Sequence, residues 1–469
     1  MSPRIRKKKG KKRGPGKKGA TAGSGGGPES LLARASALQS QGRLEEAAGL
    51  FRQVVEQFPE LPVRHQVANA LGAIYLALGR LDEAARALDA AAKDLKGRPY
   101  LPAICNLALV HLHQGRFEEA ASECRKVLAL EPRNARAWNS LALALKEEGS
   151  LVQAADAARR AVELAPGWPE AWNNLGVILE LMDRVQEAEA AFKEAADLRP
   201  GYIAPLYNLG CLYHRLDRFE ESASVLKRVL ELEEGHSGAR FLLQTLGELP
   251  QPESAPSGFV KDTFNTYAGV FEEKLKNELG YRTPEELFQE LRPLLEKAGS
   301  GLSILDLGCG TGLGAEYYRP FAGHLAGMDC AERMLEKAQE KGIYDRLFCH
   351  DILEPWPEEL SGLDLIYSSD CLVYFGDLSL VFSQAAEALA LGGLFGFSVE
   401  LLKEGMEEGR HGWRLGRSGR FAHQTSYVEK ALEQAGFETL TKKETALRRE
   451  GGRAVRGMIF TARLTAERR

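Results

Sequence analysis

The chain has 469 residues, which is long enough for two or three domains with sizeable cores. Apolar residues make up 44% of the sequence and charged residues 27%, a balance that excludes a fibrous or wholly disordered protein. No apolar run approaches the roughly 20 residues that a membrane-spanning helix needs, and the N-terminus lacks the apolar segment of a secretory signal. We therefore expect a cytoplasmic protein without a membrane span.

The net charge of −4 conceals a strongly basic N-terminal segment. Residues 1–20 contain ten lysines or arginines and no acid, so the rest of the chain is acidic. Residues 1–29 are also rich in glycine and contain almost nothing to bury, which predicts a disordered basic arm. Two roles fit this arm: a solvated tail, or weak electrostatic attachment to RNA or another acidic surface.

The seven cysteines are odd in number and scattered along the sequence. They form no CxxC pair and no cysteine–histidine cluster with the spacing of zinc ligands. This pattern predicts neither a disulfide framework nor a metal site.

A repeated pattern begins near residue 30. The segment GRLEEA starts at Gly42, GRLDEA at Gly79 and GRFEEA at Gly115, and prolines recur 34 residues apart at Pro132 and Pro166. Pairs such as Leu-Gly or Leu-Ala begin an apolar stripe, and a small residue follows 13 positions later. The period indicates helix–turn–helix units in which small residues let two helices approach closely.

These repeats resemble the tetratricopeptide (TPR) repeat in six consecutive units, at about residues 30–236. Residues 237–249 resemble a capping helix, so the solenoid is expected to span residues 30–249. Solenoids of this kind are general binding surfaces, and the resemblance implies recruitment of a protein partner or substrate.

Three asparagines, Asn106, Asn174 and Asn208, occupy the same position in their repeats, with Ser140 interrupting the series. They resemble the asparagine ladder with which some TPR-bearing transferases hold a peptide backbone. Asparagine is also common at this position of ordinary repeats, so a purely structural role stays open.

The segment 250–258 is rich in proline and predicts an interdomain linker. Beyond it, helices are expected at about 260–279 and 283–297, and strand-like runs then alternate with helical segments. The runs are Ser303–Leu307, His324–Met328, Arg346–Cys349, Leu363–Ser368 and Gly393–Val399, followed by Glu438–Leu440 and Met458–Leu464. Residues 259–466 are therefore expected to form an α/β domain with a mostly parallel sheet and an antiparallel final strand.

A glycine-rich turn follows the first of these strands, with Gly308, Gly310 and Gly312 at every second position. Such glycines let the backbone approach a ligand closely, with amides and the N-terminus of the next helix facing it. Because Leu313 and Ala315 replace the third glycine of a dinucleotide fingerprint, the turn argues against NAD or FAD. Asp329 ends the next strand, where a carboxylate can bind both hydroxyls of a ribose. Asp351 follows the third strand, near enough to bind an exocyclic adenine amine.

The glycine turn and the two acids, in this order, resemble the class I S-adenosylmethionine-dependent methyltransferase family over about residues 260–466. The resemblance implies a Rossmann-like fold and S-adenosylmethionine as cofactor. It also implies the following contacts: the methionine part of the cofactor at Asp306 and at the backbone of Gly308, Cys309, Gly310 and Gly312; the ribose at Asp329; and the adenine at Asp351, Ile352 and Met334.

The fourth strand leads into Asp370 and Tyr374, which are expected where the methyl donor meets its acceptor. Asp370, His423 and His350 are candidate bases, although a base is needed only if the acceptor must lose a proton. A role in capping a helix is an equally open alternative for Asp370. Residues 415–423, glycine-rich and basic, predict a loop that covers the substrate.

Phe264, Tyr267 and Phe271 are expected on one face of the helix at 260–279. This face fits either a core stripe or a lid over the cofactor, in which Tyr267 reaches the methionine carboxylate.

The arrangement as a whole resembles a group of predicted TPR-containing methyltransferases without a settled substrate. It implies an S-adenosylmethionine-dependent methyltransferase whose repeats recruit a protein. Two alternatives stay open: a binding scaffold whose cofactor domain does not turn over, and an RNA- or ribosome-associated methyltransferase guided by the basic arm.

Overall fold

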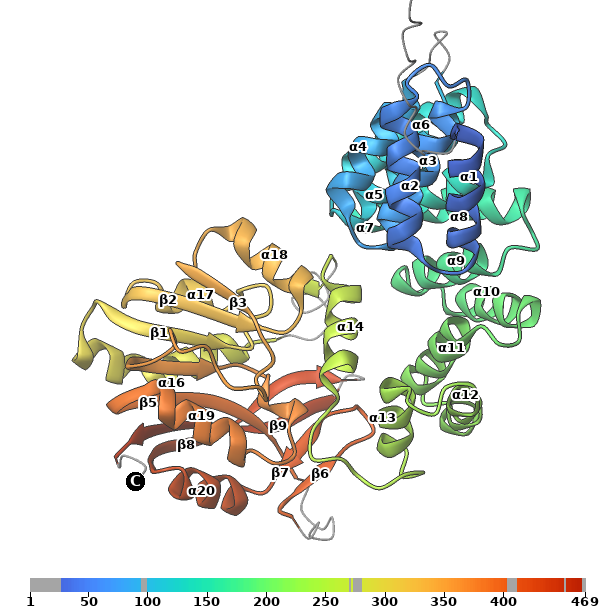
Figure 1. Cartoon of the computed structure of the whole chain (residues 1–469). Coiled ribbons are helices and arrows are strands. Elements are labelled where there is room, and N and C mark those ends of the chain that lie inside the picture. The colour runs from blue at the N-terminus through green and yellow to red at the C-terminus, as the bar shows by residue number, and fades with distance from the viewer. Residues whose placement is uncertain are drawn as a thin grey trace, which may run out of the picture. The chain divides into compact units, whose positions relative to one another are not determined.

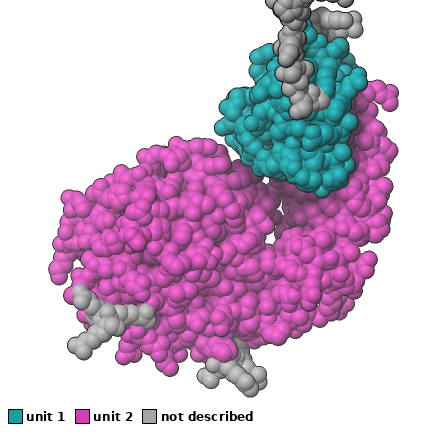
Figure 2. Space-filling model, in the orientation of Figure 1, with its two compact units in different colours: residues 1–132 teal, residues 133–469 magenta. Residues whose placement is uncertain are grey.

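Paired helices fill the N-terminal half of the chain in the computed structural model (Figure 1). The structure describes residues 27–93, 99–269, 271–272, 281–402, 411–450 and 453–465, so most of the predicted basic arm lies outside the described residues. The chain divides into two units, residues 1–132 and 133–469 (Figure 2). The first contains α1 (Pro28–Ser40), α2 (Leu44–Gln57), α3 (Arg64–Ala77), α4 (Leu81–Ala92), α5 (Leu101–His113) and α6 (Phe117–Leu130).

The second unit begins with seven further helices of the repeats. They are α7 (Ala135–Glu147), α8 (Leu151–Leu164), α9 (Pro169–Leu181), α10 (Val185–Leu198), α11 (Ile203–Arg215), α12 (Phe219–Leu232) and α13 (Ser237–Thr245). The predicted helical solenoid is confirmed by these pairs. None of the helices among the described residues is both long and apolar enough to cross a lipid bilayer.

Three glycines allow close packing within the repeats because they have no side chain. A Cβ atom added at Gly72 would lie 2.4 Å from Leu88, one at Gly176 2.5 Å from Phe192, and one at Gly210 2.6 Å from Leu226. Each partner belongs to the second helix of the same repeat. The small residue of the repeat pattern is therefore needed because a large side chain of the neighbouring helix fills its place.

The turn inside each repeat needs a residue in the left-handed region. Gly79 has a φ angle of 71°, and Gly42, Gly115 and Gly149 are similar. In the last two repeats the corresponding residues are Asp183 and Asp217, with φ angles of 56° and 57°. Aspartate is one of the few other residues that adopts this conformation readily.

An α/β domain follows the repeats. Its helices are α14 (Ser257–Tyr267), α16 (Thr283–Ala298), α17 (Ala315–Tyr318), α18 (Glu332–Lys341), α19 (Ser379–Ala388) and α20 (Thr425–Gln434), with a 3₁₀ turn, η1 (Leu372–Tyr374). Its strands are β1 (Leu302–Leu307), β2 (Ala322–Asp329), β3 (Arg346–Cys349), β4 (Leu363–Ser368), β5 (Leu389–Leu401), β6 (Trp413–Leu415), β7 (Phe421–His423), β8 (Phe437–Glu450) and β9 (Arg453–Leu464).

The strands form one mixed sheet in the order β3-β2-β1-β4-β5-β7-β6. Strands β1 to β5 run parallel to one another, whereas β9 pairs antiparallel with β5 and β8 pairs antiparallel with β9. The expected antiparallel final strand is thereby confirmed. Because parallel strands end at one edge of the sheet, the segments after β1, β2, β3 and β4 meet there.

Alternate strand residues supply two apolar cores, one on each face of the sheet. Ile304 of β1 packs with α16 and α17, whereas its neighbour Leu305 belongs to the cluster that contains residues of α19 and α20. The two faces are covered, as expected for parallel strands with apolar residues on both sides.

Three predicted elements differ from the structure. Helix α14 ends at Tyr267, and a turn at Ala268 and Gly269 follows it. Most of the remaining predicted helix, residues 270 and 273–279, lies outside the described residues. The last two strands form a long hairpin rather than two short runs. The expected substrate loop, residues 415–423, begins at the last residue of β6 and includes β7, which pairs antiparallel with β6. Strands of three residues are predicted poorly from sequence.

The proline-rich segment 250–258 is bonded to the α/β domain. Ala255 donates its backbone N–H to the Tyr374 carbonyl at 2.8 Å, and Gly376 donates to the Glu253 carbonyl at 2.7 Å. Ser254 forms a β-bridge with Phe375. The composition predicts an interdomain linker, and these backbone hydrogen bonds hold the segment beside η1, directly before α14.

Candidate functional site

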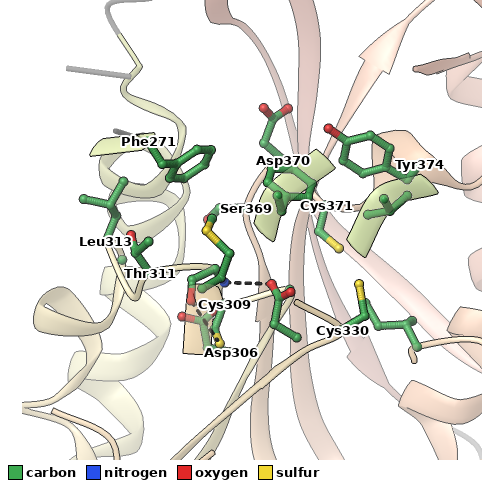
Figure 3. Close-up of a pocket in the computed structure, with 18 of the residues that line it drawn as sticks. Phe271, Asp306, Cys309, Thr311, Leu313, Cys330, Ser369, Asp370, Cys371 and Tyr374 are labelled. Carbon is green, nitrogen blue, oxygen red and sulfur yellow. Dashed lines mark hydrogen bonds between the residues drawn. The ribbon is translucent and has the colours of Figure 1, made fainter. Parts of the chain in front are cut away.

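A cavity lies at the carboxyl ends of β1, β2, β3 and β4 (Figure 3). Phe271, Leu313 and Thr311 lie on one side of it, and Asp370, Cys371 and Tyr374 lie across from them. Most of the predicted cofactor residues line it, namely Asp306, Gly308, Cys309, Gly310, Asp329, Met334, Asp351 and Ile352. Gly312 and Tyr267 are not among the lining residues.

The turn after β1 is possible only with glycine at its start. Gly308 has a φ angle of 74°, and a Cβ atom there would lie 2.4 Å from the sulfur of Cys371. Gly312, with a φ angle of 78°, lies against Tyr344, whose ring would be 2.9 Å from an added Cβ. Gly312 thus shapes the turn from outside the cavity, whereas Gly308 brings backbone to its wall.

Asp329 connects the ends of the first two strands. Its Oδ2 accepts a hydrogen bond from the Gly310 N–H at 2.9 Å, and its Oδ1 accepts one from the Ala331 N–H at 2.9 Å. Burial raises the pKa of this carboxyl, while the backbone donors act in the opposite direction. A carboxylate can accept more than these two bonds, so Asp329 both holds the glycine turn and can bind further donors in the cavity.

The helix after the turn is shorter than expected, since α17 is a single turn of four residues. Its N-terminus therefore does not provide the predicted binding site. Two hydroxyl groups that the sequence analysis missed lie in the cavity wall instead, at Thr311 and Ser369. Thr311 is 2% exposed, and within the described structure neither hydroxyl oxygen has a hydrogen-bond partner. Buried hydroxyls normally have partners, so these two are suited to contact a bound molecule.

Asp306 lies at the bottom of the cavity and is 4% exposed. Its Oδ2 accepts hydrogen bonds from the hydroxyls of Tyr344 and Tyr367, both at 2.7 Å. Burial raises the pKa of this carboxyl to about 7, and the two tyrosine hydrogen bonds act against that increase. Asp306 can therefore change its charge near neutral pH.

At one end of the cavity lie the residues that the sequence predicts to bind adenine. Residues of α14 and of the segment before it close this end. The Ser257 hydroxyl donates to Asp351 Oδ2, and Asp351 Oδ1 accepts the Leu353 N–H at 2.9 Å. Ile352 and Met334 are buried beside it. Asp351 therefore caps a turn and also lines the cavity.

Helix α14 packs over the start of α18. Phe264 and Phe271 pack against the cluster of Ala268, Ala331 and Met334, and the Asn265 side-chain oxygen accepts the Arg333 N–H at 3.0 Å. Both phenylalanines line the cavity, in the position expected of a lid.

The prediction for Tyr267 does not match its position. Burial raises the pKa of its hydroxyl to about 12, and Glu180, Arg215 and Cys211 of the repeats also act on this pKa electrostatically. The sequence predicts one helical face for all three aromatic residues. That face ends at the turn after Tyr267, so Tyr267 points to the repeats while Phe264 and Phe271 reach the cavity.

The other end of the cavity is built around a buried arginine that the sequence analysis missed. Arg448, on β8, is 2% exposed. Its Nη1 donates to Asp370 Oδ1 at 2.8 Å, and its Nη2 donates to Glu400. Asp370 adopts a φ angle of 57°, unusual for a residue other than glycine. Its predicted alternative role as a helix cap has no counterpart here, because its carboxylate binds Arg448.

Tyr374, Arg420 and Tyr281 complete this end of the cavity. The Tyr374 hydroxyl lies on the side of its ring that faces Asp370 (Figure 3), and Arg420 hydrogen-bonds to it. The Tyr281 hydroxyl donates to the Ser369 carbonyl at 3.5 Å. Arg420 lies in the predicted substrate loop, whereas no local signal marked Tyr281 or Arg448, because only the folded sheet brings them to this place.

His423 and His350 do not line the cavity. His423 is fully buried and donates from Nε2 to the carbonyls of Phe375 and Gly376, at 2.9 and 3.2 Å. Burial lowers its pKa to about 4. The prediction of His423 as a base is therefore wrong in position, since its ring belongs to the core next to η1.

The three repeat asparagines donate hydrogen bonds between neighbouring repeats. The Nδ2 atom of Asn106 donates to Asn69, that of Asn174 to Asn139 and that of Asn208 to Asn173, at 2.9 to 3.0 Å. These bonds fit the structural interpretation. Contact with a peptide backbone stays a prediction.

Family models match two parts of the chain. Residues 32–100, 105–169 and 169–234 match models described as tetratricopeptide repeat. Residues 279–442 match a model described as methyltransferase domain. The second match contains the glycine turn, Asp329, Asp351 and Asp370, and it ends before Arg448.

Three known proteins illustrate the similarity. A malonyl-[acyl-carrier protein] O-methyltransferase of Pectobacterium atrosepticum is 28% identical over 170 residues, which are 35% of this chain and 64% of that protein. A sterol 24-C-methyltransferase of Gibberella zeae is 26% identical over 164 residues, 32% of this chain and 43% of that protein. The solved S-adenosylmethionine-dependent methyltransferase from Mesorhizobium loti is 25% identical, with a TM-score of 0.29 and coverage of 37% of this chain and 97% of the other. The chain spans less than two thirds of these curated relatives.

Proposed function

The chain carries tetratricopeptide repeats and a methyltransferase domain, and from this premise we propose that it transfers a methyl group from S-adenosylmethionine to a substrate. On this proposal residues 259–466 perform the transfer, and the repeats within 30–249 recruit a protein partner or the substrate itself. Residues 250–258 connect the two parts, and a cytoplasmic location stays a prediction.

The observation that carries the proposal is the bond between the glycine turn and Asp329. Gly308 brings backbone to the cavity wall, and Asp329 holds Gly310 while keeping further acceptor capacity. This arrangement suits the methionine and ribose parts of S-adenosylmethionine. The buried hydroxyl of Thr311 adds a donor beside the turn. Asp306, as a carboxylate, can pair with the cofactor ammonium group.

The residues around the cavity also fit the rest of the cofactor. Asp351 can accept a hydrogen bond from the adenine amine, and Ile352 and Met334 provide buried apolar contact. Phe264 and Phe271 cover the cavity and help to exclude water.

The chain contributes mainly position and a dry site. When bound, S-adenosylmethionine supplies a methyl group on a sulfonium that is already an activated leaving group. The glycine turn and Asp329 hold the donor in one orientation, so that an acceptor between Asp370 and Tyr374 meets it in line. The aromatic cover lowers the local dielectric and prevents hydrolysis.

Contacts within the second unit support recruitment by the repeats. Glu147 of α7 forms an ion pair with Arg333 of α18, and Phe241 of α13 packs on Phe259 of α14 with ring centroids 4.9 Å apart. Arg417 lies over the ring of Phe219 at 4.4 Å. The last repeats therefore touch the same elements that line the cavity, so a protein bound to them would be held near it.

Incubation of the full chain with a cell extract and S-adenosylmethionine labelled in its methyl group tests the proposal. We expect label in a product and loss of labelling in the Asp329→Asn variant. Cofactor binding without any labelling would instead favour the scaffold alternative. Absence of both binding and labelling would contradict the proposal altogether.

A further inference from the structure

The end of the cavity around Asp370 is rich in hydrogen-bond donors. Arg420, Arg448, Tyr281, Tyr374 and Ser369 all line it. Burial is the main reason why the pKa values of the Tyr281 and Tyr374 hydroxyls are raised. Each hydroxyl therefore keeps its proton and can donate a hydrogen bond. The two acids of this end, Asp370 and Glu400, are already paired with Arg448.

The charges at this end balance before a cofactor binds. Two guanidinium groups, Arg420 and Arg448, face the carboxylates of Asp370 and Glu400. On the proposed function, a sulfonium at the neighbouring glycine turn adds one positive charge. In a poorly hydrated site such a charge favours an acceptor that is itself an anion.

The described lining residues also lack a suitable base. They include neither histidine nor lysine, and burial raises the pKa of Cys309, Cys330 and Cys371. Asp329 is bonded to backbone amides, Asp351 to Ser257, and Asp370 to Arg448. Asp306 lies below the glycine turn and accepts two tyrosine hydrogen bonds. An acceptor that must lose a proton would have no general base beside it, whereas an acceptor already ionised at neutral pH needs none.

We propose that the methyl acceptor of this site is a carboxylate, which Arg420 and the Tyr374 hydroxyl position for attack. This inference rests on the proposed function and adds the class of substrate to it. A lone pair of a carboxylate oxygen forms the new O–CH₃ bond while the electrons of the S–CH₃ bond pass to sulfur. No proton moves, and the products are a methyl ester and S-adenosylhomocysteine. The ester no longer carries the negative charge of the carboxylate, and the sulfur no longer carries its positive charge.

Binding of small probes tests the charge preference without turnover. The full chain saturated with sinefungin, an unreactive cofactor analogue with an ammonium group in place of the sulfonium methyl, is titrated with butyrate, butyramide and butylamine, which share one carbon skeleton. We expect butyrate to bind most tightly, and Arg420→Gln to weaken its binding by about tenfold, since a hydrogen bond to a charged group is lost. Preference for butylamine, or no preference among the three, would overturn the inference.

A matched variant and a conservative variant separate a positioning role from a structural one. Arg414→Gln removes an exposed arginine of β6 in the same loop region and should leave butyrate binding unchanged. Arg420→Lys should recover part of the affinity, because a positive charge is restored without the planar pair of donors. Equal losses in Arg414→Gln and Arg420→Gln would contradict the assignment.

The chemistry of the labelled product provides the second test. Methyl esters release methanol in mild base, whereas methyl groups on nitrogen, carbon or sulfur are retained. We expect the label transferred in a cell extract to become volatile in base, and acid precipitation then distinguishes protein carboxylates from small-molecule carboxylates. Label that resists base would overturn the carboxylate inference and leave the methyltransferase proposal standing. Cofactor binding without label would contradict both.

Discussion

The two ends of the cavity are built from different parts of the protein. The end at Gly308–Gly312 is formed by backbone and by acids at strand ends, all within the segment from β1 to the residues after β3. The end at Asp370 is formed by side chains of arginine and tyrosine from η1, the β6–β7 loop and β8. Backbone and strand-end acids suit a cofactor whose chemistry does not vary. The side chains around Asp370 can be exchanged one at a time, so this end can be adapted to different acceptors. Cofactor affinity and acceptor choice should therefore respond to different substitutions.

The strongest test of the second end is its buried ion cluster. Arg448→Met leaves Asp370 and Glu400 buried without their partner, so the free energy of unfolding should fall by about 3 to 5 kcal/mol. Chemical denaturation measures this change. Arg449→Met, at the neighbouring exposed position, is the control and should change it by less than about 0.5 kcal/mol. Equal effects of the two substitutions would show that the cluster is not what stabilises this end.

The first end should depend on backbone more than on side-chain charge. Gly308→Ala places a Cβ atom where the sulfur of Cys371 lies and should weaken S-adenosylhomocysteine binding by about 100-fold. Gly201→Ala is the control, because Gly201 lies in a turn of the repeats, does not line the cavity, and an added Cβ there would have no atom within 4 Å. Thermal shift with and without ligand measures both variants. Unchanged binding in Gly308→Ala would contradict the claim that the first end depends on its backbone.

Asp329 tests the contribution of charge to the first end. Asp329→Asn keeps the shape but replaces one acceptor oxygen by a donor, so cofactor affinity should fall by about 10- to 100-fold. Asp364→Asn removes a carboxylate that bonds to the Ser303 N–H at the opposite end of β4 and should leave affinity unchanged. Calorimetry that finds wild-type affinity in Asp329→Asn would contradict the ribose assignment.

The smallest expected effect is the pH dependence of cofactor binding. Burial raises the pKa of Asp306 to about 7, and only its charged form can pair with the cofactor ammonium. Below this pKa the carboxyl is protonated, so affinity should rise by about tenfold between roughly pH 6 and pH 8. In Asp306→Asn this increase should be absent. A profile that is the same in both proteins would assign the titration to another group.

The sequence predicts the structure where the structure depends on neighbouring residues. The repeats could be predicted because Gly72 and Leu88, or Gly176 and Phe192, recur with one period. The glycine turn and Asp329 could be predicted because the turn directly follows one buried strand and Asp329 ends the next, and the two strand ends meet at one edge of the sheet.

The second end could not be predicted because its partners are far apart in the sequence. Arg448 pairs with Asp370 across 78 residues and with Glu400 across 48, and nothing near Arg448 distinguishes it from the other arginines of the hairpin. The predictions for Tyr267 and His423 failed for a related reason. The turn after Tyr267 and the core position of His423 depend on packing between distant segments, which the spacing of nearby residues does not reveal.

Isothermal titration of S-adenosylhomocysteine into the full chain tests the central claim most directly. We expect one binding site per chain, with the affinity retained in Arg420→Gln and reduced by about 100-fold in Gly308→Ala. Absence of heat with the wild-type chain, or equal binding by the Gly308→Ala variant, would contradict it.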